Sequence, residues 1–420
     1  MCCHNATPPK LNDKTMPLIK AFAGLRPAPG RAVAVAAPPY DVLSSAEARE
    51  RAAGKPYSFL HISKPEIDLP PGTDPHAPEV YARAASNLAQ MIAHGILRRD
   101  PSPGYYAYRL TMGDHVQTGL VAAASVAAYD TGRIKKHEFT RPDKEDDRVL
   151  QIAATNAQTG PVLLAYPNAP AVDALLARAS AGEPTADVSA EDGIRHQIWV
   201  ISAPHLVEGI GAAFEALPAL YIADGHHRSA AASRVCAERQ GKGESGYFLA
   251  VVFPHHEMRI MDYNRVVTDL NGLAEEAFLN RIAGAFELAP ASPLERPSQP
   301  GEFRLYLPGR WFKLVIRPEL VPTDPVARLD VSLLSDYLLS PILGIADLRR
   351  DKRIDFVGGM RGLVELKRRV DSGEMAAAFA LFPTRMEDLM AVADAGCVMP
   401  PKSTWFEPKL ADGLVSHMLD

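Results

Sequence analysis

Hydrophobic and polar positions follow two characteristic patterns along this chain. Residues 105–112 and 116–129 have strand-like spacing, and the Gly113-Asp114 pair between them is typical of a hairpin turn. Apolar residues within 77–98 recur at helical intervals, which predicts an amphipathic helix. In the N-terminal part, three shorter segments are expected to be extended, namely 17–25, 31–37 and 57–63.

Strands and helices alternate from residue 161 onward. The expected order includes strands at 161–166 and 197–202 and helices at 170–180 and 206–217. Such alternation is typical of a partly parallel sheet. We therefore predict a mixed α/β fold in which helices flank a central mixed sheet.

A second α/β region is predicted after about residue 271. It contains helices at 272–285 and 329–339 and strands near 303–307 and 311–316. With 420 residues the chain exceeds a typical single domain, so more than one part is expected. We predict a disordered tail at 1–16, an α/β core at 17–270, and a C-terminal region at 271–420 whose final loop returns to the functional site.

The composition narrows the class of protein. With 47% hydrophobic and 23% charged residues, it is ordinary for a soluble globular protein. A net charge of -5 gives no overall attraction to nucleic acid, so phosphate binding requires a local cluster of positive charge. No apolar run approaches the ~18 residues of a membrane span, and residues 1–16 lack the apolar segment of a signal peptide.

Cysteine usage indicates a reducing compartment. The four cysteines form no CxxC pattern, which suits a reducing cytoplasm. The Cys2-Cys3-His4 sequence is interpreted as part of a mobile tail rather than as a metal site. We expect a cytoplasmic protein that does not associate with a membrane.

The most informative stretch is 221–230. An apolar, strand-like run ends in Asp224-Gly225-His226-His227-Arg228, and an alanine-rich helical run follows at once. Open α/β sheets bind ligands where the carboxyl end of a strand meets the amino end of a helix. The stretch therefore predicts a binding site at this turn.

Three interpretations of the turn stay open from the residues alone. An acid and neutral imidazoles could ligate a metal ion, with Glu138, Glu145 or a distant histidine as further ligands. Arg228 and histidine donors could hold a phosphate at the helix start. Alternatively, Asp224 caps the helix and Gly225 only allows the turn. A cap does not explain two histidines followed by an arginine, so we favour a functional site.

Charged residues are densest at 135–148. Pro142 suits a first helical position, and acids in the next turn suit the helix dipole. Helical spacing places Glu145 at the edge of the apolar face and Lys144 beside Arg148. Several polar side chains precede this helix in a loop, where binding groups concentrate: Lys136, His137, Glu138, Thr140 and Arg141.

A proline-rich loop at 400–409 also carries many functional side chains. Residues 396–403 approach a phosphate-binding P-loop, but Pro401 takes the position of the second glycine and lacks the amide that the loop needs. No GxGxxG, GxSxG or HExxH motif occurs, so dehydrogenase, esterase and zinc-protease interpretations lack their usual support. Side chains that could still donate to a phosphate are Lys402, Ser403, Thr404 and Lys409.

Together these motifs resemble the bacterial and archaeal domain of unknown function 1015 family. The resemblance extends from about residue 17 to the end and rests on the segments 38–41, 136–148, 223–228, 262–265 and 400–409. The family name conveys no activity. The Asp-Gly-His-His-Arg turn alone also resembles, more weakly, the turn of the ParB, sulfiredoxin and free-serine kinase superfamily. That second resemblance implies nucleotide phosphate binding and phosphoryl transfer to or from serine.

The residue chemistry and the resemblance agree on phosphate. The first hypothesis is a phosphotransferase or phosphohydrolase that acts on a small metabolite, with serine and phosphoserine as leading candidates and Mg²⁺ with ATP or ADP as cofactors. The alternatives are a metal-dependent hydrolase and a non-catalytic nucleotide-binding or ParB-like regulatory module. Nucleic acid is not an expected partner, because the chain is acidic and lacks a basic surface interleaved with aromatic residues.

Each candidate residue has an expected role in the first hypothesis. Glu138 or Glu145 would act as a base, or would hold magnesium with Asp224. His226 or His227 could instead form a phospho-enzyme. The candidate phosphate-binding residues are Lys136, Arg141, Lys144, Arg148, Arg228, Lys402, Ser403, Thr404 and Lys409, and the secondary candidates are Asp41, His137, Asn264 and Arg265.

Overall fold

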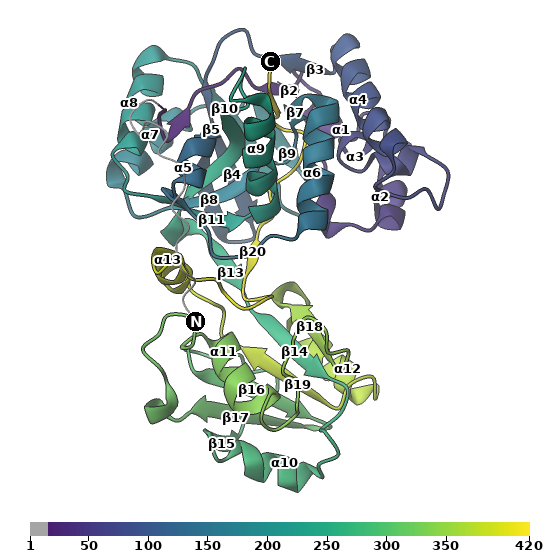
Figure 1. Cartoon of the computed structure of the whole chain (residues 1–420), viewed down its shortest axis with the longest axis vertical. Coiled ribbons are helices and arrows are strands. Elements are labelled where there is room, and N and C mark those ends of the chain that lie inside the picture. Colours follow the sequence, from purple (N-terminus) through teal and green to yellow (C-terminus); the bar gives the residue numbers. More distant parts are fainter. Residues whose placement is uncertain (1–15) are drawn as a thin grey trace. The chain divides into compact units, whose positions relative to one another are not determined.

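The computed structural model describes residues 16–420, so the expected tail lies outside the described residues except for Met16. The described chain forms two compact units (Figure 1): the first extends to Met258 and also includes Pro408–Asp420, and the second comprises Arg259–Glu407. The division comes before the expected boundary at 270, because strand β14 (Tyr263–Val267) pairs with strands of the second unit.

A nine-stranded mixed sheet forms the centre of the first unit. Strands β12 and β8 run parallel, as do β11 and β6, and the other pairs are antiparallel, so the predicted mixed α/β fold is confirmed. The order along the sheet is β6 (Ile134–Lys135), β11 (Leu220–Asp224), β8 (Val162–Tyr166), β12 (Tyr247–Pro254), β5 (His115–Ser125), β4 (Tyr105–Met112), β10 (Arg195–Ile201) and β9 (Ala186–Ser189), and β1 (Ile19–Lys20) also pairs with β5.

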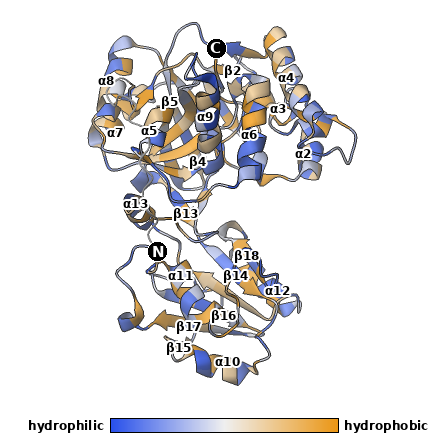
Figure 2. Cartoon of the chain, in the orientation of Figure 1, coloured by the Kyte–Doolittle hydropathy of each residue, from blue (hydrophilic) through white to orange (hydrophobic). Residues whose placement is uncertain are grey.

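The helices of the first unit are amphipathic or short and pack on this sheet or on one another. Figure 2 shows the strands of the sheet as mostly hydrophobic, and Leu164 and Ile222 of the sheet share one buried core with Leu176 and Phe214 of two helices. The helices are α1 (Ala32–Val35), α2 (Ser45–Ala52), α3 (Leu60–Ser63), α4 (Pro78–Ala93), α5 (Val126–Asp130), α6 (Pro142–Thr155), α7 (Pro170–Ala179), α8 (Pro204–Glu215) and α9 (His226–Arg239). Among the helices of residues 16–420, none has both the length and the apolar character that crossing a bilayer requires.

Two short segments differ from the sequence prediction. Residues 31–37 and 57–63 were expected to be extended, but they contain the helices α1 and α3. A few alternating residues fit either structure, and burial decides between them. Here Val35, Leu60 and Ile62 are all buried in one apolar cluster, which the helical turns make possible.

The predicted hairpin is confirmed, with β4 and β5 paired in antiparallel register. The second strand is shorter than predicted, because the Ser125 side chain accepts a hydrogen bond from the Ala128 amide and so caps the start of α5. Two further short pairs complete the first unit, namely β2 (Leu25–Pro27) with β3 (Leu97–Arg99) and β7 (Ala157–Gln158) with β21 (His417–Met418).

The second unit contains a six-stranded antiparallel sheet. Its strand order is β15 (Phe286–Pro290), β17 (Arg310–Ile316), β16 (Glu302–Leu307), β19 (Ala377–Leu381), β14 (Tyr263–Val267) and β18 (Ile354–Gly358). Its helices are α10 (Glu275–Ile282), α11 (Asp330–Leu334), α12 (Gly362–Asp371) and α13 (Met386–Asp394), and a separate pair joins β13 (Arg259–Met261) to β20 (Trp405–Glu407). The expected α/β character of this region is therefore present.

Candidate functional site

The Asp-Gly-His-His-Arg turn lies where β11 passes into α9, as the sequence predicted. Gly225 has a φ of 97°, which glycine adopts without steric strain. A Cβ atom at this position would lie 3.0 Å from Nε of Arg228, so the turn also needs a residue without a side chain. Asp224 Oδ1 accepts a hydrogen bond from the Gly225 amide at 2.8 Å.

The amino end of α9 has no side-chain cap within the described residues. The interpretation of Asp224 as the helix cap is therefore wrong, since Gly225 is the N-cap residue and Asp224 accepts from the Gly225 amide rather than from an amide within α9. Uncapped amides and the positive end of a helix dipole favour an anion. The start of α9 thus has the local electrostatics of a phosphate site.

Arg228 brings together carboxylates from separate segments of the first unit. Its Nη2 lies 3.8 Å from Oδ2 of Asp41 and 3.6 Å from Oδ2 of Asp224. Its Nη1 donates to the carbonyl oxygen of Pro161. Lys409 Nζ lies 3.6 Å from Asp224 Oδ2. We refer to Asp41, Asp224, Arg228 and Lys409 as the charged corner.

The opposite charges of the corner keep Asp224 and Arg228 ionised. Burial raises the pKa of Asp224, but the Lys409 and Arg228 charges outweigh it and lower the pKa to about 2. Burial lowers the pKa of Arg228, but the facing carboxylates of Asp41 and Asp224 outweigh it and raise the pKa above its usual value. Both groups are therefore ionised at neutral pH. The side chains of Asp41 and Asp224 are 41% and 37% exposed, so a ligand can reach them.

The two histidines hold the preceding loop against α9. His226 Nε2 accepts from the His137 amide at 3.4 Å, and His227 Nε2 accepts from the Arg141 amide at 3.1 Å. In a neutral imidazole that accepts at Nε2, the proton is on Nδ1. Neither ring, in this arrangement, presents a lone pair for nucleophilic attack.

Burial keeps these imidazoles neutral. It lowers the pKa of His226 well below the usual value and the pKa of His137 to about 4. The two rings pack edge to face with their centroids 4.5 Å apart. Burial also lowers the pKa of His227. His226 Nδ1 lies 3.8 Å from Glu138 Oε2, so the buried His226 ring lies beside a carboxylate that is half exposed.

The two glutamates proposed as bases have different surroundings. The Glu138 side chain is 51% exposed and lies beside His226. The Glu145 side chain is mostly covered, and its Oε2 lies 3.5 Å from Nη1 of Arg234 on α9. Glu145 therefore joins α6 to α9, whereas Glu138 is accessible to a ligand.

Arg148 lies close to Arg228 but has its own partners. Its Nε and Nη2 donate to Asp147 Oδ2 at 2.9 and 2.5 Å, and its guanidinium carbon lies 4.0 Å from the centroid of the Tyr40 ring. Tyr40, Arg148 and Arg228 line a cavity of about 30 Å³. A space of this size holds a water molecule or two and not a phosphate, so the role of Arg148 as a phosphate ligand stays a prediction.

Other basic candidates lie at the surface of the same loop and helix. Lys136 Nζ lies 3.9 Å from the centroid of the Tyr129 ring, and burial lowers its pKa. Arg141 donates to both oxygens of Asp143. Lys144 is exposed in the first turn of α6.

One residue of this region had not been singled out from the sequence. Asp412 is buried, its Oδ2 accepts from the Tyr40 amide at 3.3 Å, and its Oδ1 has no hydrogen-bond partner among residues 16–420. Burial raises the pKa of Asp412 to about 7, although the nearby Arg228 charge lowers it. The available signal was a single acid within the mostly apolar stretch 410–419.

The remaining candidates belong to the second unit. Lys402 has a φ of 60°, Ser403 Oγ donates to the Pro400 carbonyl at 2.6 Å, and Thr404 is partly buried. Asn264 is buried and bridges Asp262 and the Leu381 amide. Arg265 is buried and donates to the carbonyl oxygens of Tyr263 and Lys402. The expected roles of these residues in phosphate binding stay predictions.

The acids and histidines were also candidates for a metal site. Residues 16–420 contain no group of three or more His, Cys, Asp or Glu side chains arranged to hold a metal ion. The accessible oxygen ligands of the corner are the carboxylates of Asp41 and Asp224.

The sequence model of a family described as "Protein of unknown function (DUF1015)" matches residues 19–332. The chain belongs to the DUF1015 family. This confirms the family indicated by the sequence motifs, and the matched range includes the loop at 136–148 and the turn at 224–228. No curated protein matches this DUF1015 chain.

Solved structures with similar folds are distant in sequence. A conserved hypothetical protein from Pyrococcus furiosus is 14% identical, with a TM-score of 0.36 over 71% of this chain and 95% of that chain. A free serine kinase in complex with AMP is 14% identical, with a TM-score of 0.36 over 70% and 92%. SbnI from Staphylococcus aureus, with a C-terminal truncation, is 11% identical, with a TM-score of 0.35 over 70% and 86%.

Proposed function

We propose that this protein is a nucleotide- or phosphate-dependent phosphotransferase or phosphatase that acts on a small molecule at the charged corner. The uncapped amino end of α9 beside Arg228 and Lys409 is the observation that carries this proposal. Backbone amides and two cations attract phosphate oxygens and offset the charge that spreads over a transferring phosphoryl group.

The carboxylates of the corner fit a bound magnesium nucleotide. Mg²⁺ commonly takes one or two protein carboxylates and completes its shell with waters and substrate phosphates. Asp224 stays ionised at neutral pH, because the Lys409 and Arg228 charges hold its pKa at about 2 against the effect of burial. Asp224 and Asp41 would hold the ion, and ATP or ADP would supply its phosphate ligands.

Glu138 is the better candidate for the base. It is half exposed, whereas Glu145 is mostly covered and is paired with Arg234. In the transfer step, a substrate hydroxyl oxygen forms a bond to the phosphorus, the bond to the leaving nucleotide oxygen breaks, and Glu138 accepts the hydroxyl proton.

Direct transfer fits the histidines better than a phospho-histidine intermediate. Both Nε2 atoms accept backbone hydrogen bonds from the loop. Their role in the proposal is to position that loop, and with it Glu138. Serine and phosphoserine are the first substrates to test, as the resemblance of the turn to that of the free-serine kinase superfamily implies.

Turnover of defined substrate pairs tests the proposal. The full chain is incubated with Mg²⁺, ATP or ADP and serine, or with phosphoserine alone, and the products are followed by ³¹P NMR. We expect one of these mixtures to react, and Lys409→Met to slow it by about 10²–10³-fold, as removal of one charge-stabilising group does. Lys242→Met is the matched control, since this exposed lysine lies beyond the far end of α9.

Two results would contradict the proposal. In one, no mixture reacts, even though the protein is folded and binds ADP, which would favour a non-catalytic nucleotide-binding module. In the other, a reaction occurs but Lys409→Met leaves it as fast as Lys242→Met does, which would place the reaction elsewhere.

A further inference from the structure

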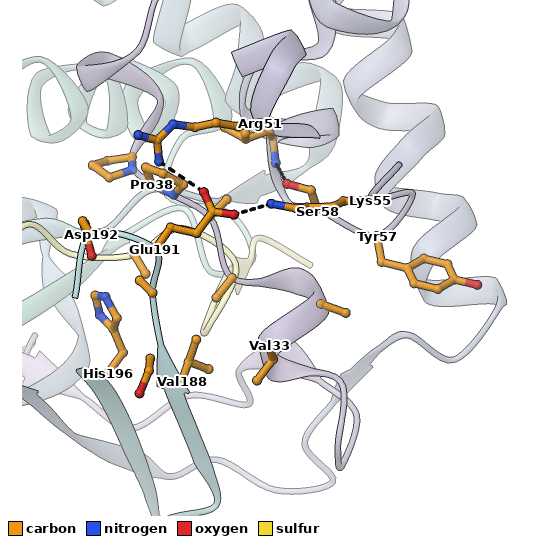
Figure 3. A pocket seen from close by; sticks show the side chains of 18 of the residues that line it. Val33, Pro38, Arg51, Lys55, Tyr57, Ser58, Val188, Glu191, Asp192 and His196 are labelled. Carbon is orange, nitrogen blue, oxygen red and sulfur yellow. Dashed lines mark hydrogen bonds and ion pairs between the residues drawn. The ribbon is translucent and has the colours of Figure 1, made fainter. Parts of the chain in front are cut away.

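A cavity of about 450 Å³ lies in the first unit beside the charged corner. Figure 3 shows its side chains, which come from α1, from residues 38–39 and 51–60, and from the β9–β10 hairpin. The volume falls in the range of small-molecule sites. Lys409 lines this cavity and also lies 3.6 Å from Asp224 of the corner, so the two regions adjoin.

His196 supplies a hydrogen-bond donor at the cavity wall. The buried Tyr108 hydroxyl accepts from the Ala411 amide at 3.1 Å and lies 2.7 Å from His196 Nδ1. Among the described residues no other acceptor contacts this hydroxyl, so its proton is donated to Nδ1. Burial lowers the pKa of His196 to about 4, so the ring is neutral and carries its proton on Nε2.

Carboxylates provide the complementary acceptors. Figure 3 shows the His196 ring directed toward Asp192, which is exposed and lines the same cavity. The neighbouring Glu191 is already paired, with Lys55 Nζ at 2.6 Å and Arg51 Nη1 at 3.9 Å. Asp192 Oδ1 accepts from the Ile194 amide at 3.0 Å, so Oδ2 of Asp192 is the oxygen better suited to accept from ligand hydroxyl groups.

The remaining wall is apolar. Val33 is 69% exposed although it is a large aliphatic residue, and it lines the cavity together with Pro38 and Val188. A flat ring would cover these side chains and remove them from water. The lining thus combines an apolar surface, one neutral N–H donor and one carboxylate acceptor.

We propose that this cavity binds the nucleoside part of a nucleotide. The base packs on Val33 and Pro38 and accepts a hydrogen bond from His196 Nε2, and the sugar hydroxyls donate to Asp192. The phosphates extend past Lys409 toward the amino end of α9. This assignment rests on the proposed function only for the direction of the phosphates.

Calorimetric titration of the full chain with adenosine, guanosine and AMP tests the proposal. We expect at least one of them to bind, and Asp192→Asn to weaken that binding about tenfold, as the loss of a charged acceptor does. Ala34→Trp places a large side chain on the cavity wall and should abolish binding. The matched controls are Glu183→Gln, an exposed acid of the loop before β9, and Ala32→Trp, on the same helix but outside the cavity lining.

The outcomes separate this inference from the proposed function. Weaker nucleoside binding in Asp192→Asn and its loss in Ala34→Trp, with unchanged binding in the controls, support the inference even if no phosphoryl transfer is ever found. Binding that both cavity variants leave unchanged overturns it, and so does the absence of binding by all three probes. Phosphoryl transfer from ATP or ADP that keeps its nucleotide KM in both variants would also overturn it, while the proposed function would stand.

Discussion

The charged corner of the first unit has a sequence pattern similar to that of the polar residues on β14 in the second unit. In the corner, Asp224 and Arg228 come from a short polar run at the end of the hydrophobic strand β11, and Asp262, Asn264 and Arg265 form a short polar run at the start of β14. In the corner, Asp41 and Asp224 keep more than a third of their side-chain surface exposed. On β14, Asn264 and Arg265 are buried, and their polar atoms bond to groups of their own unit.

The arginines make the difference clear. Arg228 faces the carboxylates of Asp41 and Asp224, which raise its pKa despite burial. Burial instead lowers the pKa of Arg265 to about 9, and this arginine donates hydrogen bonds to carbonyl oxygens. The carboxylates of the corner stay accessible, as a ligand site requires, whereas the polar groups on β14 bond within their own unit. We refer to Asp262, Asn264 and Arg265 as the β14 cluster.

The largest expected contrast comes from the same substitution in both regions. Asp224→Asn should slow phosphoryl transfer by about 10²–10³-fold. Asp262→Asn should leave transfer unchanged but lower the free energy of unfolding by about 2 kcal/mol, because it weakens contacts to Arg296 and Asn264. If both variants lost activity without losing stability, the β14 cluster would be functional and the comparison would fail.

Asn264→Ala tests how strongly the β14 cluster stabilises the second unit. The change leaves the Leu381 amide without its acceptor and Asp262 Oδ2 without the Asn264 donor, so we expect the free energy of unfolding to fall by about 2–4 kcal/mol. Urea unfolding monitored by circular dichroism measures this loss. Asn280→Ala, at an exposed position of α10, is the control and should change stability by less than about 0.5 kcal/mol.

The pH dependence of stability tests the buried acid behind the corner. Burial raises the pKa of Asp412 from 3.8 to about 7, so between these values the folded state binds more protons than the unfolded state. The contribution of Asp412 to the free energy of unfolding therefore falls as the pH rises through this window. Asparagine has no charge to bury. The free energy of unfolding of Asp412→Asn minus that of the wild type should therefore be larger at pH 8 than at pH 5. If this difference between variant and wild type were the same at both pH values, as expected for the control Asp114→Asn, the pKa of Asp412 would not be raised.

The smallest expected effect concerns the turn itself. Gly225→Ala and Gly132→Ala both place a side chain at positive φ, with φ values of 97° and 81°. Only at Gly225 does the new Cβ approach another side chain, that of Arg228. We expect backbone strain to lower the free energy of unfolding of both variants by about 1–2 kcal/mol. Gly225→Ala should lower it by a further fraction of a kcal/mol and should also reduce activity. Equal losses in thermal unfolding, with unchanged activity, would mean that Arg228 moves aside freely.

Local sequence signals predicted the elements that form the candidate site. Pro142 and the following acids predict the start of α6, and the apolar run before Asp224 predicts β11. Contacts between distant segments had no such signal. Asp412 reaches Tyr40 across 372 positions of sequence, and the backbone bonds that occupy the Nε2 atoms of His226 and His227 come from a loop more than 80 residues earlier. Spacing along the chain cannot encode which lone pair a folded neighbour will occupy.

The place of Lys409 and Asp412 in the chain affects the order in which the protein is built. Both residues follow the whole second unit in sequence, yet they belong to the first. Domains generally fold from the N-terminus as the ribosome delivers the chain. A nascent chain that has stopped within the second unit therefore has Asp224 and Arg228 but lacks the lysine that pairs with Asp224. The corner becomes complete only after translation has passed residue 412, so an aborted product carries the turn without its full set of charges.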